Sequence, residues 1–596
     1  MNHFRKIIVA MQGQNKTGLH WLYNEVFTNC PDYNPREKIF YHRSMAFWFQ
    51  GTGRRTAEKL ILSVALPMEA RKEDSIPVTT YLLSQIVPVI HAWNEENRND
   101  NKAREKARFI VQDPGNRMLL RNGITYDEQS ERYVLRMVFY VPLINGVSVN
   151  GKAAFRGVAE VLTLMDERLA VLDMSELKAY CRTYRRQQQI RRFLRENGYC
   201  AFVANGSILP REKDSDDPMQ GAIPFVSPKE SEITIELEES NVAKGPDDGI
   251  CKTSDGKTII TGMGIPSGIT VITGGGYSGK STLLDALEAG IYDHIPGDGR
   301  EFVIAEQSAL KVYAEDGRPV SELDLSAFFR FLPGKPLDAF CTPHASGSVS
   351  QASNILEAVS GGSKLLLIDE DKSATNFMIR DHIMRLLVED EPIIPFTERV
   401  TELWKDRKVS TILVIGGSSE YLHLADQVIL MKDFCPQMIT GAVRKLVEAK
   451  ELAQQKELAQ VKQEESLPVA KWQFSRRLVV RETSQPFLYF RTVETENEKK
   501  IILDEYSADV TMLTAISTHE QLCTATVISE RLLTDLDGGR REALDNVKAY
   551  LKDLFEKGKT GSIMPETQSW FYEEIRPLDA LCCINRMRGA TFVSPS

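Results

Sequence analysis

Apolar residues occur along this chain both in short continuous runs and at helical spacings, and the alternation of the two predicts an α/β fold. Continuous runs at residues 269–273, 365–368 and 411–415 predict buried strands, because a parallel strand is covered on both faces. Further strands are predicted at residues 134–141 and 233–237, and helices at residues 184–196, 282–288 and 351–359.

The pattern changes at three places and divides the chain into three domains and a linker. A proline-rich turn region closes an N-terminal α/β domain, residues 1–230, which carries basic patches. A middle domain follows at residues 231–440. Residues 441–466 predict a helical linker, and its near-repeat of six residues rather than seven favours a solvated helix over a coiled coil. Residues 467–596 predict a C-terminal α/β domain with a helix at residues 541–557.

Composition limits the function classes without naming one. The chain has 596 residues, enough for several domains, and its net charge of −9 restricts any basic surface to a local patch. None of the nine cysteines forms a C-x-x-C pair, so the sequence indicates neither a zinc site nor a disulfide framework. No apolar run approaches the length of a membrane span, and we expect no membrane partner.

The amino-terminal segment allows two interpretations. Arg5, Lys6 and Lys16 precede the first acidic residue, Glu25, as they would in an organellar presequence. Residues 4–9 also have the pattern of a first element in a folded domain, and this interpretation is favoured.

Residues 274–282 fit the phosphate-binding P-loop pattern G-x-x-x-x-G-K-[ST]. Gly274 and Gly279 let the backbone turn so that its N–H groups converge on the phosphates. Lys280 supplies a cation for the β- and γ-phosphates, and the Ser281 hydroxyl can ligate Mg²⁺. The following helix adds its dipole to the anion site. The predicted nucleotide-binding residues of the loop are Gly274, Gly275, Gly276, Tyr277, Ser278, Gly279, Lys280, Ser281 and Thr282.

A second predicted strand ends in the carboxylates Asp369 and Glu370. Ligands bind at the carboxyl ends of strands in an α/β sheet, so we expect Asp369 to hold Mg²⁺ through water. Glu370 is the predicted catalytic group that orients or deprotonates the attacking water, while Lys280 neutralises the phosphates. The alternative, a surface acidic pair after a core strand, is disfavoured by the P-loop upstream.

Two short motifs flank the acidic strand. Residues 346–348, Ser-Gly-Ser, precede a predicted helix, and residues 373–376, Ser-Ala-Thr-Asn, follow the carboxylates. With the P-loop, this ordered set resembles the ABC class of ATPases. A serine hydroxyl and N–H groups at a helix N-terminus suit the γ-phosphate of a nucleotide held by another subunit. Ser346, Gly347 and Ser348 are therefore predicted to complete the ATP site of a second copy.

A closer resemblance is to the small family of predicted ABC-class ATPases of bacteria and some protists. The stretches that carry it are residues 201–211, 262–266, 294–301, 314–318 and 367–378. The resemblance implies an α/β fold in which a P-loop NTPase of ABC-ATPase type is embedded between additional N- and C-terminal α/β domains. It also implies a homodimer and work on nucleic acid. One kinetoplastid member is mitochondrial and associated with RNA editing, which implies a mitochondrial location if that resemblance holds and a cytoplasmic one otherwise.

The sequence departs from the ABC pattern at two points. No histidine follows the strand at residues 411–415, so the γ-phosphate sensor is expected to be Ser418 or Ser419, or to be missing, and slow hydrolysis is then expected. His423 comes later, on a predicted helix. Gln307 follows a predicted strand and is the candidate for the Mg²⁺-contacting glutamine of the class. No aromatic residue stands just before the P-loop to stack on adenine.

One helix face is the main candidate for nucleic-acid contact. Basic residues recur between residues 178 and 192 at helical spacing, with Tyr180 and Tyr184 between them as predicted stacking groups. The alternative is an ordinary solvated helix face. With a second patch in a predicted loop, the candidate nucleic-acid residues are Lys178, Arg182, Arg185, Arg186, Arg192, Arg54 and Arg55.

The sequence therefore predicts an ABC-type ATPase that binds and hydrolyses Mg²⁺-ATP as a head-to-tail dimer and acts on nucleic acid. RNA is the first choice and DNA the second, in a larger RNA-processing complex. The alternatives are a nucleotide-gated RNA–protein scaffold with little turnover and, less favoured, the ATPase subunit of a transporter.

Overall fold

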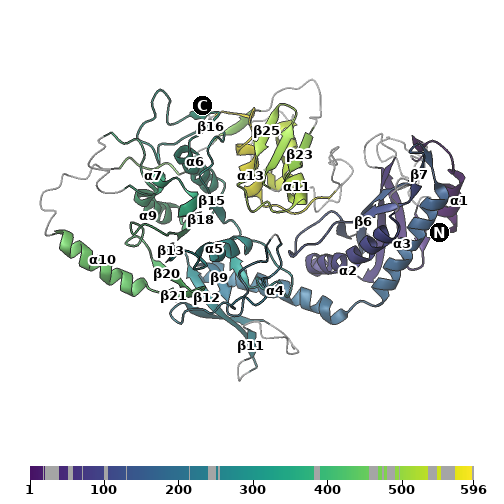
Figure 1. Cartoon of the computed structure of the whole chain (residues 1–596), viewed down its shortest axis with the longest axis horizontal. Coiled ribbons are helices and arrows are strands. Elements are labelled where there is room, and N and C mark those ends of the chain that lie inside the picture. Colours follow the sequence, from purple (N-terminus) through teal and green to yellow (C-terminus); the bar gives the residue numbers. More distant parts are fainter. Residues whose placement is uncertain are drawn as a thin grey trace.

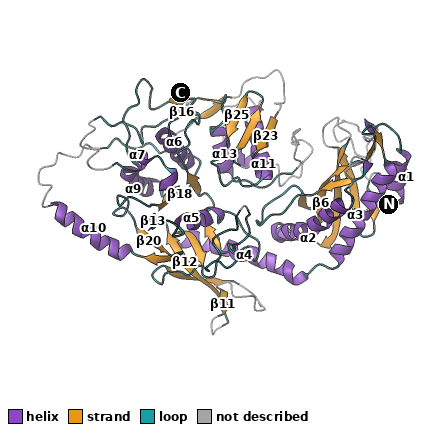
Figure 2. Cartoon of the chain, viewed as in Figure 1, coloured by secondary structure: helices purple, strands orange, loops and turns teal. Residues whose placement is uncertain are grey.

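The computed structural model describes residues 1–17, 19, 39–51, 58–69, 72–98, 105–128, 130–213, 215–238, 250–252, 256–380, 390–455, 467–472, 476–479, 490–495, 497–534, 547–551 and 571–593. Figure 1 shows an N-terminal unit at one end and a larger body built from the rest of the chain. The long helix α4 (Met174–Asn197) runs between them. Helices and strands are mixed in every part, as Figure 2 shows, which confirms the α/β expectation.

The N-terminal unit is an antiparallel sheet covered by helices. Its strands are β1 (Phe40–His42), β2 (Met45–Gly51), β3 (Lys59–Glu69), β4 (Arg108–Ile110), β5 (Ile124–Asp127) and β6 (Arg132–Tyr140), with a hairpin of β7 (Leu143–Ile144) and β8 (Ser148–Val149). Its helices are α1 (Asn2–Ala10), α2 (Ser75–Glu96) and α3 (Gly151–Ala170). The strand order is β1-β2-β3-β6-β4, and β5 also pairs with β6. β6 is the strand predicted at residues 134–141.

The amino-terminal residues are part of this unit. Phe4 of α1 is fully buried and packs against Phe40, Phe47 and Phe49, with ring centroids 5.3, 5.6 and 5.3 Å away. Aromatic packing of this kind stabilises a core beyond the area that it buries. Residues 4–9 are therefore a folded first element, as the favoured interpretation expected.

Helix α4 joins the N-terminal unit to the rest of the molecule. The Asp173 side chain caps its start by accepting the backbone N–H of Ser175 at 2.8 Å. Near this end Tyr180 packs on Tyr81 of α2, with ring centroids 5.4 Å apart. Near the other end the buried Arg191 donates to Asp293 Oδ1 at 3.0 Å and to the Ala305 carbonyl at 2.9 Å. Buried contacts therefore anchor both ends of α4, one to the N-terminal unit and the other to the rest of the molecule.

The middle region contains an antiparallel sheet beside a mainly parallel one. Its strands are β9 (Tyr199–Ala204), β10 (Glu232–Leu237), β11 (Ile250–Lys252), β12 (Thr258–Pro266) and β14 (Val303–Ala305). The order is β10-β12-β9-β14, with β11 on β12. The sheet does not follow the boundary predicted at residue 230, because β9 pairs with both β12 and β14. The turn-rich residues before 230 connect two strands of one sheet rather than two domains.

The core of the middle region is a mainly parallel sheet. Its strands are β13 (Ile269–Gly274), β15 (Leu310–Val312), β18 (Leu365–Asp369), β19 (Ser410–Val414), β20 (Gln427–Lys432) and β21 (Cys435–Met438), in the order β15-β18-β19-β13-β20-β21. All neighbours are parallel except β20 and β21, which form a hairpin. The three continuous apolar runs are β13, β18 and β19, at the centre of the sheet, as their composition predicted.

Helices and one hairpin surround this sheet. They are α5 (Lys280–Ala289), α6 (Gly347–Ser360), α7 (Thr375–Met378), α9 (Phe396–Arg407) and the hairpin of β16 (Val320–Leu323) and β17 (Phe340–Thr342). Apolar residues fill both faces of the sheet. Leu283 and Leu287 of α5 join the cluster on one side, and Ile355 of α6 and Val400 of α9 join the cluster on the other.

The C-terminal region packs directly on the core. Its elements are β22 (Arg477–Val479), β23 (Phe490–Glu494), β24 (Lys499–Leu503), β25 (Tyr506–Asp509), β26 (Thr591–Val593), α11 (His519–Thr534) and α13 (Pro577–Asn585). Ile584 of α13 belongs to the same apolar cluster as α6. The predicted linker helix is α10 (Thr440–Gln455), and residues 456–466 lie outside the described residues. Of the helix predicted at 541–557, residues 547–551 are helical and the remainder is likewise outside.

Candidate functional site

The loop between β13 and α5 has the backbone that the glycine pattern predicts. Gly274 has φ 148° and Gly279 has φ 95°, values that side chains rarely allow. A Cβ on Gly274 would also lie 2.3 Å from the carbonyl oxygen of Met431 on β20. Gly274 is therefore required both for its conformation and for the close approach of the neighbouring strand.

Polar groups of this loop are poised around an anion site. The Lys280 ammonium donates to the carbonyl oxygens of Gly274 and Gly275, at 2.8 and 2.7 Å. The hydroxyl of Ser278 is buried and has no hydrogen-bond partner among the described groups. An orphaned donor and a lysine folded over the loop fit a phosphate, which would take hydrogen bonds from both.

The predicted magnesium ligands lie together at the carboxyl edge of the sheet. The Ser281 hydroxyl, in the first turn of α5, donates to Asp369 Oδ2 at 3.3 Å, and Asp369 is buried at the end of β18. The other carboxylate oxygen accepts the backbone N–H of Asp371 at 3.2 Å. A hydroxyl and a carboxylate are hard oxygen donors, so the pair fits Mg²⁺ bound with waters and phosphate oxygens. Bound there, Mg²⁺ would neutralise phosphate charge.

Glu370 is held by the loop after β19, in which the sequence offers Ser418 and Ser419 as candidate sensors but predicts no role for the two preceding glycines. Its Oε2 accepts the backbone N–H groups of Gly416 and Gly417, at 2.7 and 3.2 Å. These glycines directly follow β19, where the class usually places a histidine. Two backbone donors therefore orient the carboxylate without a side chain. The signal for them was the Gly-Gly pair after the predicted strand.

Ser418 and Tyr421 complete this corner. Ser418 Oγ accepts the N–H of Glu420 at 3.1 Å, one residue beyond the glycines that hold Glu370, and its sensor role stays a prediction. His423 lies in a turn, not on the helix predicted for it. Tyr421 is fully buried and donates to the Met378 carbonyl at 2.7 Å. Burial, with the charge of Glu370 nearby, raises the pKa of Tyr421 well above its ordinary value.

The prediction that Gln307 contacts Mg²⁺ is wrong. Gln307 precedes β15, which runs parallel to β18 with Leu310 opposite Leu366. It lies beyond the amino end of β15, whereas Asp369 lies at the carboxyl edge of the sheet. The side chain of Gln307 is exposed, and its backbone carbonyl accepts a hydrogen bond from Arg576 at 2.8 Å. The segment at the correct edge is residues 313–316, because it follows β15.

The serine-glycine motif begins α6 with an open N-terminus. Ser346 is exposed, and no side chain caps the helix. A helix start presents unpaired N–H groups and a positive dipole end. Ser348 Oγ donates to Asn376 Oδ1 at 2.8 Å, which ties the motif to the segment after the carboxylates. No hydrogen bond joins residues 346–348 to residues 274–282, both of which the structure describes completely.

A buried charge cluster connects α6 to the C-terminal region. Glu357 of α6 accepts from Arg318 and from Arg476, each at 2.7 Å. Arg586, just after α13, pairs with Glu315 and donates to Asn354 of α6 at 2.9 Å. Because Glu315 lies in the segment after β15, the C-terminal region contacts both this segment and α6. Glu315 and Arg318 lie within residues 314–318, a stretch that carries the family resemblance, but no motif indicated their partners in α6 and the C-terminal region.

The residues of α4 that the sequence predicts to contact nucleic acid differ in exposure, and their role stays a prediction. Lys178, Arg185 and Arg192 are exposed, and Arg182 is half-buried on the same side. Arg185 pairs with Asp74 at 2.6 Å. Arg186 and Tyr180 are buried, at 8% and 6% exposure, so neither is available to a nucleic acid. Tyr184 is half-buried, and Arg54 and Arg55 lie outside the described residues.

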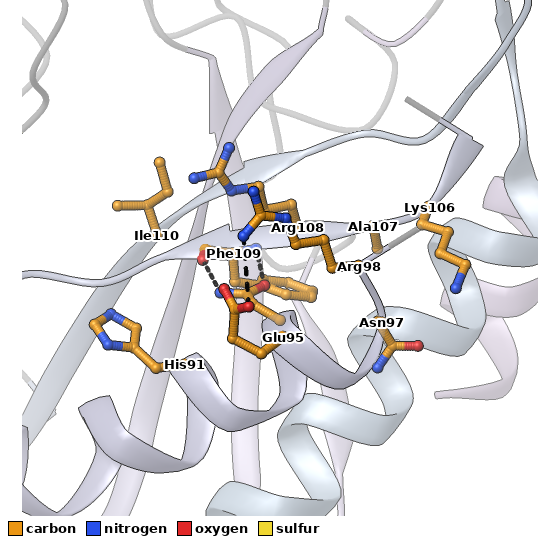
Figure 3. A pocket seen from close by; sticks show the side chains of 10 residues that line it. His91, Glu95, Asn97, Arg98, Lys106, Ala107, Arg108, Phe109 and Ile110 are labelled. Carbon is orange, nitrogen blue, oxygen red and sulfur yellow. Dashed lines mark hydrogen bonds and ion pairs between the residues drawn. The ribbon is translucent and has the colours of Figure 1, made fainter. Parts of the chain in front are cut away.

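A second basic surface lies in the N-terminal unit. A pocket of about 650 Å³ opens between the end of α2 and β4, and Figure 3 shows its lining residues. Arg98, Lys106 and Arg108 contribute three cations, and Glu95 pairs with Arg98 at 3.6 Å. This pocket is on a different unit from the P-loop, so it is not the nucleotide site.

The described residues contain neither a metal-binding cluster of acidic, histidine and cysteine side chains nor a membrane-spanning helix. No group of three or more His, Cys, Asp or Glu side chains there is arranged to hold a metal ion. In the same part of the chain, no helix combines the length and apolar character needed to cross a membrane.

Comparison with known proteins gives one family match and one curated relative. The model of the ABC ATPase P-loop domain matches residues 173–466. The chain is 30% identical over 323 residues to the uncharacterized protein MJ1628 of Methanocaldococcus jannaschii. The matched region is 52% of this chain and 65% of that protein, so the chain spans slightly less than two thirds of the relative's length.

Two solved structures have local similarity to this chain. One is cbiO1 of Clostridium perfringens, part of the ABC transporter complex cbiONQ, at 16% identity over 35% of this chain and 92% of that chain, with a TM-score of 0.24. Another is MJ1267, an ATP-binding cassette of an ABC transporter in its ADP conformation, at 12% identity over 35% of this chain and 96% of that chain, with a TM-score of 0.21.

Proposed function

Because the chain belongs to the ABC-class ATPases through its P-loop domain at residues 173–466, we propose that it hydrolyses ATP between two copies packed head to tail. Each ATP would lie between the P-loop of one copy and Ser346, Gly347 and Ser348 of the other. The proposal rests mainly on the meeting of Ser281, Asp369 and Glu370 at one edge of the sheet. The same chain also has an open N-terminus at α6.

Each group has a defined part in the proposed reaction. Lys280 would leave the carbonyls of Gly274 and Gly275 and bind the β- and γ-phosphates. Glu370, fixed by two backbone N–H groups, would position a water for in-line attack on the γ-phosphate and accept its proton. The partner's α6 N-terminus would stabilise charge on the transferred phosphoryl group.

The first test replaces Glu370 by Gln. The amide keeps the shape and loses the base, so ATP turnover should fall by about 100-fold or more while ATP binding persists. The matched control is Asp371→Asn. Asp371 is the next residue along the chain and is exposed, so this variant removes the same charge from a neighbouring position. Phosphate release and ATP binding are measured for both. Equal turnover in the two variants would remove Glu370 from its proposed role.

A complementation assay tests the head-to-tail arrangement. Lys280→Ala disables a P-loop, and Ser346→Glu places a carboxylate where the partner's γ-phosphate would lie. A mixture of the two inactive variants contains dimers with one intact composite site, so it should regain up to about a quarter of wild-type turnover. If the mixture stays as inactive as its components, the site is not shared between copies.

We further propose that the flanking units act on nucleic acid, with RNA before DNA. The exposed cations of α4 and the basic pocket beside α2 support this, because phosphate contacts supply most of the non-specific affinity for nucleic acids.

The rival function is a nucleotide-gated scaffold that turns ATP over very slowly. It is favoured by the absence of the histidine after β19 and disfavoured by the fixed orientation of Glu370. Phosphate release measured with and without RNA separates the two.

A further inference from the structure

The hairpin between β20 and β21 has an unusual residue at its tip. Its two turn residues, Asp433 and Phe434, have φ values of 49° and 64°. A two-residue turn of this hand needs positive φ at both positions, which is why asparagine and glycine are the usual occupants. A phenylalanine there carries a backbone penalty, and strain of this kind persists where the side chain serves a purpose.

The tip of the hairpin lies against the P-loop. The Phe434 N–H donates to the carbonyl of Ser278 at 3.2 Å. Its ring touches Gly279, since a Cβ on that glycine would lie 3.1 Å from Phe434 Cδ1. The side chain is nevertheless 56% exposed. An aromatic ring is thus held at the rim of the phosphate loop with much of its surface free of protein contact.

The order of the strands indicates which end of a nucleotide approaches this ring. Asp369 and Glu370 follow β18, which is separated from the P-loop strand β13 by β19. The γ-phosphate and its metal belong on that side. β20 and β21 lie on the opposite side of β13, as the labels in Figure 1 also show. A nucleotide whose terminal phosphate faces β18 therefore directs its nucleoside toward β20 and β21.

We propose that Phe434 is the platform on which the nucleobase stacks. The assignment rests on the proposed binding of ATP at residues 274–282 and adds the subsite for its base. Stacking reads the size of the π-face rather than the hydrogen-bonding edge. The site should therefore prefer purine over pyrimidine nucleotides and discriminate weakly between adenine and guanine.

The test compares a nucleotide with its phosphates alone. Phe434→Gly removes the ring and suits the positive φ, so the melting temperature should not fall. The Kd for Mg²⁺-ATP should rise about tenfold, equivalent to about 1.4 kcal/mol, while the Kd for Mg²⁺-tripolyphosphate stays unchanged. Phe434→Trp, which keeps an aromatic face, should retain ATP affinity. The control Phe331→Gly removes another exposed phenylalanine and should change neither Kd.

The outcomes separate the subsite from the site. An unchanged ATP affinity in Phe434→Gly would overturn the platform, and so would an equal loss for ATP and tripolyphosphate, since the residue would then shape the loop itself. If the wild-type protein binds neither compound, the proposed ATP site fails. Weaker binding of CTP and UTP than of ATP and GTP in the wild type, with the difference lost in Phe434→Gly, would confirm the stacking.

Discussion

At the scale of single residues, two neighbouring glycines of the P-loop have different structural roles. A Cβ on Gly274 would collide with a backbone carbonyl, and φ is positive there. Gly275 has no atom within 4 Å of the same position. We predict that Gly274→Ala destabilises the protein by about 2 kcal/mol and abolishes ATP binding, because a strained backbone costs 1–3 kcal/mol. Gly275→Ala should leave the free energy of unfolding nearly unchanged.

Denaturant unfolding and ATP titration of both variants check this prediction. Equal destabilisation by the two substitutions would show that the collision at Gly274 is relieved by movement of β20.

The residue scale also shows where a sequence motif was enough to identify residues that lie together. Ser281 and Asp369, each predicted separately as a magnesium ligand, are joined by a hydrogen bond of 3.3 Å.

At the scale of elements, α6 is held from two sides by charge. Burial alone would raise the pKa of Glu357, but the charges of Arg318 and Arg476 outweigh it and hold that pKa below its ordinary value of 4.5. Burial would likewise raise the pKa of Glu315, but the charge of Arg586 outweighs burial and holds that pKa below its ordinary value. A lowered pKa contributes stability that is present above the ordinary pKa and is lost as pH falls through the folded-state pKa.

We therefore predict that Glu357→Gln destabilises the protein by about 3 kcal/mol at neutral pH, because two buried arginines lose their counter-charge. Its free energy of unfolding should also fall less steeply than that of the wild type as pH drops below about 4.5. Glu505→Gln, at an exposed position in the C-terminal region, is the control. Denaturant unfolding across this pH range measures both effects, and parallel acid profiles for the wild type and Glu357→Gln would contradict the assignment.

At the scale of the whole molecule, α4 connects the N-terminal unit to the ATPase. Its anchors are Tyr180, which packs on Tyr81 of α2, and Arg191, which donates to Asp293 and to the Ala305 carbonyl of β14. Movement of the ATPase on nucleotide binding would therefore reposition the cations of α4. This connection gives the proposed link between ATP and nucleic acid a physical route.

The corresponding prediction concerns salt. Lys178→Glu with Arg192→Glu should weaken binding to single-stranded RNA and reduce the slope of log K against log salt by about 1.4, for two lost phosphate contacts. Lys405→Glu with Lys445→Glu makes the same change in net charge on other exposed positions and should leave the slope unchanged. Fluorescence anisotropy at several salt concentrations provides the measurement. Identical slopes for the two double variants would remove α4 from the binding surface.

The sequence alone determined the parts of the site that are local. The P-loop, the acidic strand end and the serine-glycine helix start are contiguous motifs, and apolar runs placed β13, β18 and β19 because parallel strands are buried on both faces. Only the tertiary structure decided what depends on strand order. Gln307 follows one strand but precedes the next, so its position at the wrong edge appears only once β15 pairs with β18. The backbone donors at Gly416 and Gly417, the burial of Arg186 and the contact of Phe434 with Gly279 likewise join segments that are distant in sequence. The physical reason is that local spacing fixes a residue's conformation and face, whereas packing between elements fixes its neighbours.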